Sequence, residues 1–173
     1  LPWGAQALAP AVAAMAATGV DYIKIGLFEP NAATTPSALD EIAEVRRVLQ
    51  QAQLRVVAWP AQLIAVLFAD RVPEFGVLAA FADAGFAGVM LDTADKSRGG
   101  LRAHLKPTDL SAFCRRVREH KLLLGLAGAL RAPDVAALLP LAPDYLGFRG
   151  ALCEDDDRVA RIVPARIRAV RAL

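Results

Sequence analysis

The most informative segment of the chain is Gly88-Val89-Met90-Leu91-Asp92-Thr93-Ala94-Asp95-Lys96. Its apolar first half predicts a buried strand, and glycine-containing segments bound it on both sides. An unpaired carboxylate is costly to bury, so Asp92 needs a partner. At the carboxyl end of a parallel strand, that partner is often a substrate or a catalytic lysine. The alternative is that Asp92 caps the next helix or binds a neighbouring loop.

Apolar runs of strand length alternate with segments of helical periodicity along the whole chain. This alternation predicts βα units and an α/β fold with a parallel sheet. Five such units suit an open doubly wound sheet, whereas eight units, about 250 residues, suit a TIM (β/α)8 barrel. Strands are predicted at 22–27, 63–68, 88–92, 122–127 and 145–150, and helices at 7–18, 37–49, 73–84, 107–120, 133–139 and 158–173. Similar short connectors join helix to strand at 18–22, 84–88 and 142–146.

The composition is that of one globular domain. The 173 residues are 55% hydrophobic and 22% charged, with a net charge of +2. This small charge gives no reason to expect nucleic acid or a membrane surface as a partner. Two cysteines and two histidines, scattered along the chain, suggest neither a disulfide framework nor a metal site. We therefore expect no metal and no cofactor, and take the reducing cytoplasm as the default location.

The chain begins at Leu1 rather than at methionine. Its first residues already look like the loop that precedes a helix. We expect a single domain over residues 1–173 that is the later part of a longer barrel, with the N-terminal strands missing.

Polar side chains lie within or just after four of the predicted strands, namely Lys24, Asp70, Asp92 and Arg149, and Lys96 follows the third. Carboxyl ends of parallel strands converge on one mouth, so these groups are expected to share a site. Inside a barrel, a desolvated lysine amine can act as a base or nucleophile. The alternative for Lys24 is a side chain that reaches the rim and pairs with a carboxylate. Lys96 either meets Asp92 four residues earlier or lies in a solvated loop.

Small residues follow the last two predicted strands. Exposed backbone N–H groups at Gly128, Ala129 and Gly150 can cradle a phosphate, with Arg149 adding a bidentate charge. Barrel enzymes often bind phosphate after their seventh and eighth strands. The alternative is that these glycines allow close packing of strands.

Four motifs together resemble one family, the (5-formylfuran-3-yl)methyl phosphate synthases of methanofuran biosynthesis, also described as tetrahydromethanopterin-biosynthesis-related proteins. The resemblance spans nearly the whole chain, and the motifs stand in the family's order. One departure is Asp95, where the family usually has an apolar residue. The motifs are Asp21-Tyr22-Ile23-Lys24-Ile25-Gly26-Leu27, Leu91-Asp92-Thr93-Ala94-Asp95-Lys96, Leu126-Ala127-Gly128-Ala129-Leu130 and Gly147-Phe148-Arg149-Gly150-Ala151-Leu152-Cys153.

The resemblance implies a TIM barrel of which this chain holds the last five βα units. It implies a lyase that condenses two molecules of glyceraldehyde 3-phosphate to a furan aldehyde phosphate through a lysine Schiff base, with loss of phosphate and water. The family's Schiff-base lysine lies in an Asp-Val-Lys-Asn-Pro-like motif, which these 173 residues do not contain. Lys24 matches the family's proton-accepting lysine. Asp92, Lys96 and Asp70 match other catalytic positions.

Two other functions remain open at this point. One is a non-catalytic phosphate-binding or assembly module built on a partial barrel, which would oligomerise to cover its open sheet edges. The other is a different Schiff-base aldolase-type barrel, with the same site and another product. For the synthase we expect a small phosphorylated aldehyde as substrate and a homo-oligomer as the assembly.

Overall fold

The computed structural model describes residues 5–27, 61–71, 73 and 75–173. Within them lie five strands, with helices before the first strand, between the later strands from β2 onward and after the last. The strands are β1 (Tyr22–Leu27), β2 (Gln62–Phe68), β3 (Gly88–Asp92), β4 (Leu123–Leu126) and β5 (Tyr145–Leu146). The α-helices are α1 (Ala5–Ala16), α3 (Leu78–Asp83), α4 (Leu101–His104), α5 (Pro107–Glu119), α6 (Ala132–Leu138) and α7 (Pro164–Arg171). Short 3-10 helices are η1 (Ala69–Arg71), η2 (Phe75–Val77), η3 (Lys96–Arg98), η4 (Leu139–Leu141), η5 (Gly150–Leu152) and η6 (Glu154–Asp156).

The strands form one parallel sheet in the order β1-β2-β3-β4-β5. The spatial order therefore equals the sequence order, with no reversal of direction across the sheet. A doubly wound sheet reverses its strand order at a switch point, whereas a barrel adds each strand beside the one before it. The described sheet thus has the topology of a barrel segment, and it confirms the predicted α/β fold.

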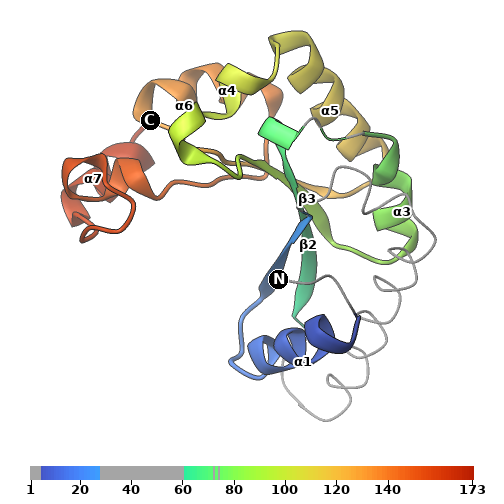
Figure 1. The fold of residues 1–173 in the computed structure, drawn as a ribbon. Coiled ribbons are helices and arrows are strands. Elements are labelled where there is room, and N and C mark those ends of the chain that lie inside the picture. The colour runs from blue at the N-terminus through green and yellow to red at the C-terminus, as the bar shows by residue number, and fades with distance from the viewer. Residues whose placement is uncertain (1–4, 28–60, 72, 74) are drawn as a thin grey trace.

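The two faces of the sheet bury different side chains. Ile23 and Ile25 of β1 and Val89 and Leu91 of β3 pack into the larger hydrophobic cluster, together with residues of the helices. The alternate positions form a second, smaller cluster, which consists of Ile64, Val66, Phe68, Met90 and Ala127. Figure 1 shows α3, α5, α4 and α6 following one another along the outer side of the sheet, with α7 far from α1. The small cluster therefore marks the inner face.

The sheet is strongly curved. Lys24 of β1 and Tyr145 of β5 come from its two outermost strands, yet the Lys24 Nζ lies 5.6 Å from the centre of the Tyr145 ring. In a flat sheet, the backbones of these strands would be roughly 19 Å apart, because neighbours are spaced by about 4.8 Å. Side chains perpendicular to a flat sheet could not meet across that distance. Contact between the edges therefore requires the inward curvature of a barrel.

Several predicted elements are shorter in the structure, among them two near the C-terminus. The helix predicted over residues 158–173 begins only at Pro164, because proline lacks an N–H and is accommodated in the first helical turn. The strand predicted over 145–150 ends at Leu146, although the Gly147 N–H still donates to the carbonyl of Leu126. Beyond it the chain turns into η5, so Arg149 lies in a loop rather than in a strand. The helix predicted over 37–49 lies outside the described residues.

Among the helices that the structure describes, none combines the length and the apolar character needed to cross a membrane.

Candidate functional site

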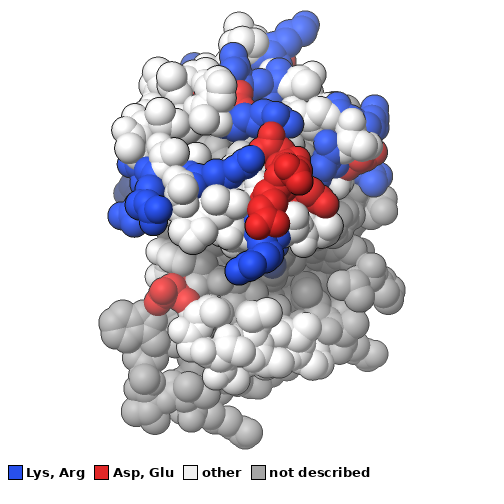
Figure 2. Space-filling model, turned by 90° about the vertical axis from the view of Figure 1, so that its left-hand side faces the viewer, with Lys and Arg blue, Asp and Glu red and all other residues white. Residues whose placement is uncertain are grey.

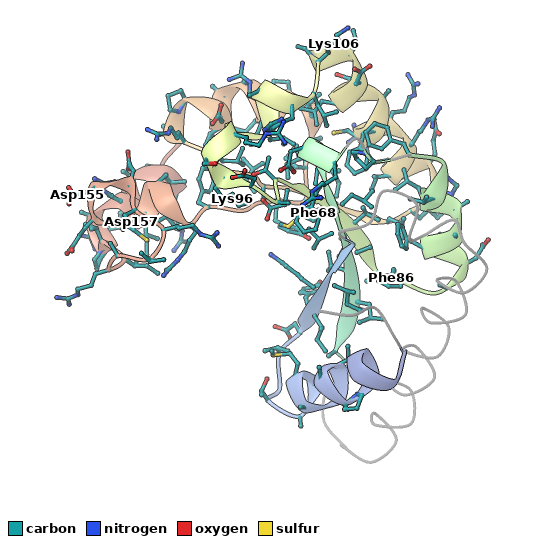
Figure 3. All side chains as sticks on the ribbon, in the orientation of Figure 1. Phe68, Phe86, Lys96, Lys106, Asp155 and Asp157 are labelled. Atoms are coloured by element: carbon teal, nitrogen blue, oxygen red, sulfur yellow. The ribbon has the colours of Figure 1, made fainter. Side chains whose placement is uncertain are left out.

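A cleft of about 660 Å³ opens at the carboxyl ends of the strands. It is lined by inner-face side chains of β1, β2 and β3 and by the loops that follow β3, β4 and β5. Lys24, Asp92 and Lys96 all line it. In Figure 3, Lys96 and Phe68 lie on the inner side of the helices, toward the segment that carries Asp157, whereas Lys106 points away on the outer surface. The structure therefore brings three of the four predicted catalytic side chains into one cleft.

Lys24 points into the curved sheet and not toward the helices. Its neighbours Ile23 and Ile25 are 6% exposed and pack in the cluster on the helix side, so the side chain between them must take the opposite face. Lys24 pairs in register with Ile64, which belongs to the inner cluster. The structure thus gives Lys24 the inward orientation.

Asp92 lies on the same face as Lys24 but nearer the rim. It pairs in register with Phe68, four residues beyond Ile64 along β2. Four residues of a strand span roughly 13 Å. Lys24 thus comes from deeper in the sheet, and Asp92 stands at the strand end, with the cleft extending over both levels.

Lys96 is held at the strand end by three oxygen atoms. Its Nζ forms an ion pair with an Asp92 carboxylate oxygen and donates to the carbonyl of Thr93. It also lies 3.1 Å from the Thr93 hydroxyl. The Asp92 carboxylate accepts in addition from the Thr93 N–H at 2.7 Å. The loop therefore folds back so that Lys96 meets Asp92, which was the first of the two alternatives for this residue.

Asp70 lies beside this loop and not in the cleft lining. Its two carboxylate oxygens accept from the backbone N–H groups of Ala94 and Asp95, each at 2.8 Å. Burial raises the pKa of Asp70, but these backbone hydrogen bonds outweigh it and the pKa falls below its ordinary value. Asp70 was expected to share the site with the other three groups. The structure instead gives it the position of an anchor for the loop between Asp92 and Lys96.

Asp95, the departure from the family pattern, is the N-cap residue of η3. Its side chain accepts from the Ser97 N–H at 2.9 Å and from the Ser97 hydroxyl at 2.6 Å. These hydrogen bonds lower the pKa of Asp95. The residue is exposed and does not line the cleft, so its charge leaves the contacts of Asp92 and Lys96 in place.

The backbone after β4 forms one wall of the cleft. Gly128 has φ +105°, and a Cβ there would lie 3.0 Å from the Thr93 Cγ2 and 3.1 Å from the Thr93 N. Ala129 also has a positive φ of 48°. Glycine at 128 thus satisfies both the backbone conformation and a close approach to the strand end. Gly128 and Ala129 line the cleft, as expected for the candidate phosphate site.

The loop after the neighbouring strand β5 forms another part of the cleft wall. Arg149 and Gly150 line the cleft, and the Arg149 Nε donates to the Arg158 carbonyl at 2.9 Å. A Cβ on Gly150 would lie 2.8 Å from the Asp156 carbonyl oxygen, so this glycine also serves close packing of the chain. Asp156 pairs with Arg131 at 3.2 Å and with Arg166 at 2.5 Å, which links the loop after β4 to α7.

Charges of both signs surround this wall. Figure 2 shows an acidic patch on the face toward α7, with Lys and Arg side chains on either side of it. The acidic segment is Glu154, Asp155, Asp156 and Asp157. Asp156 and Asp157 reach the cleft lining, together with Arg131 and Arg158.

Several lining or supporting residues were not predicted as part of the site, among them Thr93, Arg131 and Arg158. Thr93, which is 1% exposed, contributes two of the three oxygen atoms around Lys96. It stood three residues before Lys96, a spacing that could have suggested the contact. Arg131 and Arg158 carried no sequence signal, because their approach depends on the fold of the 150–163 segment.

Within the described part of the chain, no group of three or more His, Cys, Asp or Glu side chains is placed to hold a metal ion. The residues that line the cleft carry amines, guanidinium groups, carboxylates and the hydroxyl of Ser97. Such a set suits proton transfer and the binding of an anionic substrate.

Comparisons with known proteins give a consistent result. The profile of the family described as 4-HFC-P synthase matches residues 1–171. A protein of Methylorubrum extorquens that carries the provisional name (5-formylfuran-3-yl)methyl phosphate synthase is 42% identical over 168 residues, which cover 96% of this chain and 64% of the relative. The (5-formylfuran-3-yl)methyl phosphate synthase of Methanopyrus kandleri is 33% identical over 168 residues, which cover 91% of this chain and 66% of that protein.

The chain thus spans about two thirds of the length of these relatives. Among solved structures, phosphoribosyl anthranilate isomerase from Thermus thermophilus aligns with 95% of this chain at 14% identity and a TM-score of 0.48.

Proposed function

The chain belongs to the 4-HFC-P synthase family, and on that basis we propose that it carries part of the active site of a (5-formylfuran-3-yl)methyl phosphate synthase. In the proposed reaction two molecules of glyceraldehyde 3-phosphate condense, with loss of phosphate and water, as a step of methanofuran biosynthesis. The enzyme is then a lyase that uses a lysine Schiff base. The observation that carries the proposal is that Lys24 of β1 lines the same cleft as Asp92, at the end of β3, and Lys96 in the loop after it.

Lys24 is the proposed base. A Schiff base between a second lysine and the substrate aldehyde withdraws electrons from the adjacent carbon. Lys24 then takes the proton from that carbon, and the enamine that results attacks the aldehyde of the second molecule. Its place on the inner face, in register with Ile64 and in the lining of the cleft, supports this role. The lysine that forms the Schiff base belongs to a motif that the 173 residues do not contain.

Asp92 and Lys96 are proposed to act together in the dehydration steps. The Lys96 ammonium can donate a proton to an oxygen that leaves, and Asp92 orients that ammonium and balances its charge. Asp70 is proposed as a positioning residue, since it touches the loop that joins these two residues and does not touch the cleft.

The phosphate of the substrate is proposed to lie between the loops after β4 and β5. Backbone N–H groups of Gly128, Ala129 and Gly150 and the guanidinium of Arg149 are the proposed contacts. Their support is that all four residues line the cleft. We further propose that the chain belongs to the C-terminal part of a TIM barrel, and the homo-oligomer remains a prediction.

Borohydride trapping tests the chemistry. The full product of the gene is incubated with glyceraldehyde 3-phosphate, reduced with borohydride and weighed intact by mass spectrometry. The proposal predicts a covalent adduct, and predicts that Lys24→Gln still forms the adduct while it makes furan aldehyde at least about 100-fold more slowly than the parent. If the full gene product forms no adduct, the Schiff-base mechanism is contradicted and a phosphate-binding module is favoured. An adduct without a furan product would favour another aldolase.

A further inference from the structure

Tyr145 lies on the inner face of β5, opposite the strand that carries Lys24. Its register partner on β4 is Gly125, which pairs in turn with Met90 of the inner cluster. The Lys24 Nζ lies 5.6 Å from the centre of the Tyr145 ring. This is within the range of a cation–π contact, in which the negative face of the ring attracts the ammonium.

Gly125 makes room for the ring. A Cβ at this position would lie 2.4 Å from the Tyr145 Cζ, 2.5 Å from its hydroxyl oxygen and 2.6 Å from its Cε2. Real Cβ atoms do not approach other atoms so closely, so any larger residue would displace the ring. Gly125 has no positive φ, and its requirement for glycine is therefore spatial.

The hydroxyl of Tyr145 has no hydrogen-bond partner among the described residues, and its oxygen is buried. Burial raises the pKa of Tyr145 to about 12, with further contributions from Asp144 and Tyr22. The phenol therefore stays neutral at working pH. Its ring faces Lys24 as a neutral aromatic surface and not as a phenolate counter-ion.

We propose that Tyr145 is a positioning residue, whose ring holds the amine of Lys24 inside the curved sheet so that it shares the cleft with Asp92. Gly125 is needed for this contact, because its lack of a side chain leaves the space that the Tyr145 ring occupies. Only the kinetic part of this inference rests on the proposed function. The contact between ring and amine is independent of it.

Chemical labelling of the amine tests the contact without any activity measurement. Folded protein receives a brief pulse of acetic anhydride, and the acetylation of Lys24 is compared by mass spectrometry with that of the exposed Lys106 in the same sample. A cation–π contact protects the amine, so Tyr145→Leu is expected to raise the ratio of Lys24 to Lys106 labelling about 2- to 5-fold. Tyr145→Phe keeps the ring and should match the parent.

Further variants guard against misfolding. Tyr145→Met is the substitute if the leucine variant does not fold, as judged by circular dichroism. Gly125→Ala keeps the tyrosine but displaces its ring, and should also raise the ratio, whereas Gly76→Ala, where a Cβ meets nothing within 4 Å, should not. Unchanged labelling in the ring-deleted or ring-displaced variants would overturn the proposal. So would a phenylalanine variant that behaves like the leucine variant.

Kinetics separate this inference from the proposed function. With the full gene product, Tyr145→Leu is expected to lower kcat for furan formation about threefold or more while KM changes little, and Tyr145→Phe should restore it. If the ratio of Lys24 to Lys106 labelling changes in the Tyr145 variants but the parent makes no furan product, the contact is supported and the proposed function is contradicted. If the parent makes the furan product but the labelling ratio does not change in the variants, the function is supported and the contact is contradicted.

Discussion

The Lys96 ammonium lies at the end of β3 among oxygen atoms of Asp92 and Thr93. Asp92→Asn keeps an acceptor for this ammonium but removes the negative charge that balances it. If the pair transfers protons, kcat for the furan product should fall about 100-fold or more. The measurement is the initial rate with glyceraldehyde 3-phosphate.

The matched control is Asp109→Asn, an exposed aspartate in the first turn of α5 that does not line the cleft. Its rate should stay within about twofold of the parent, as expected for a surface change. Equal rates for the parent and Asp92→Asn would remove Asp92 from the proposed chemistry.

The stability that Asp70 gives to the loop after β3 is expected to depend on pH. Because the pKa of Asp70 is lowered in the folded protein, its ionised form stabilises the fold above the carboxyl's ordinary pKa, and this stability is lost as pH falls through the lowered value. Asp70→Asn can accept only through its one carbonyl oxygen. It should therefore cost about 1 to 3 kcal/mol at pH 7.

Urea unfolding of the parent and of Asp70→Asn across pH 2 to 7 measures this effect. The difference in free energy of unfolding should be greatest near neutral pH and shrink below about pH 4. A difference that stays constant over the whole range would show that the carboxylate charge contributes nothing.

Arg149 belongs to the proposed phosphate contacts. Replacing it by glutamine removes a charge-assisted hydrogen bond to the substrate, so KM for glyceraldehyde 3-phosphate should rise about 10-fold or more. Arg168→Gln, on α7 and outside the cleft lining, is the control. If both variants keep the KM of the parent, the phosphate lies elsewhere.

At the scale of elements, the connectors between helix and strand repeat one conformation. The chain takes a positive φ at Gly19 (81°), Gly85 (77°), Lys121 (56°) and Ala142 (50°). Glycine adopts this conformation freely, whereas residues with a Cβ are strained in it. Two of the four connectors thus carry the residue that the turn favours and two do not.

Ala142→Gly should therefore raise the free energy of unfolding by about 0.5 kcal/mol, since the side chain is exposed and little packing is lost. Denaturant unfolding checks it. Ala80→Gly, inside α3, is the control and should cost about 1 kcal/mol. A destabilised Ala142→Gly would show that the left-handed turn is not strained.

The strands could be predicted because they are continuous apolar runs between turn residues. The predicted strand 88–92 has the observed bounds of β3, and 63–68 differs from β2 by one residue. The helix predicted from Pro73 begins instead as η2 and becomes α-helical only at Leu78. The C-terminal segment was misjudged because the basic residues of 158–163 fit a helical pattern, whereas the helix begins only at Pro164.

At the scale of the molecule, strand order and curvature decide which side chains meet. Alternation along β1 placed Lys24 opposite its isoleucine neighbours, but the sequence left open which of the two faces was the inner one. The packing of Ile23 and Ile25 against the helices shows it, and the curvature agrees, because it brings Lys24 of the first described strand to Tyr145 of the last. Contacts between residues far apart in sequence, such as Asp70 with the Ala94–Asp95 backbone, have no local signal at all.

The rate of furan aldehyde formation by Lys24→Gln tests the account most directly. With the full gene product and glyceraldehyde 3-phosphate, the variant should be slower by a factor of about 100 to 10,000, because a base within the cleft is removed. Lys106→Gln, which changes an exposed lysine on the outer surface, should match the parent. Equal rates for parent, Lys24→Gln and Lys106→Gln would contradict the account.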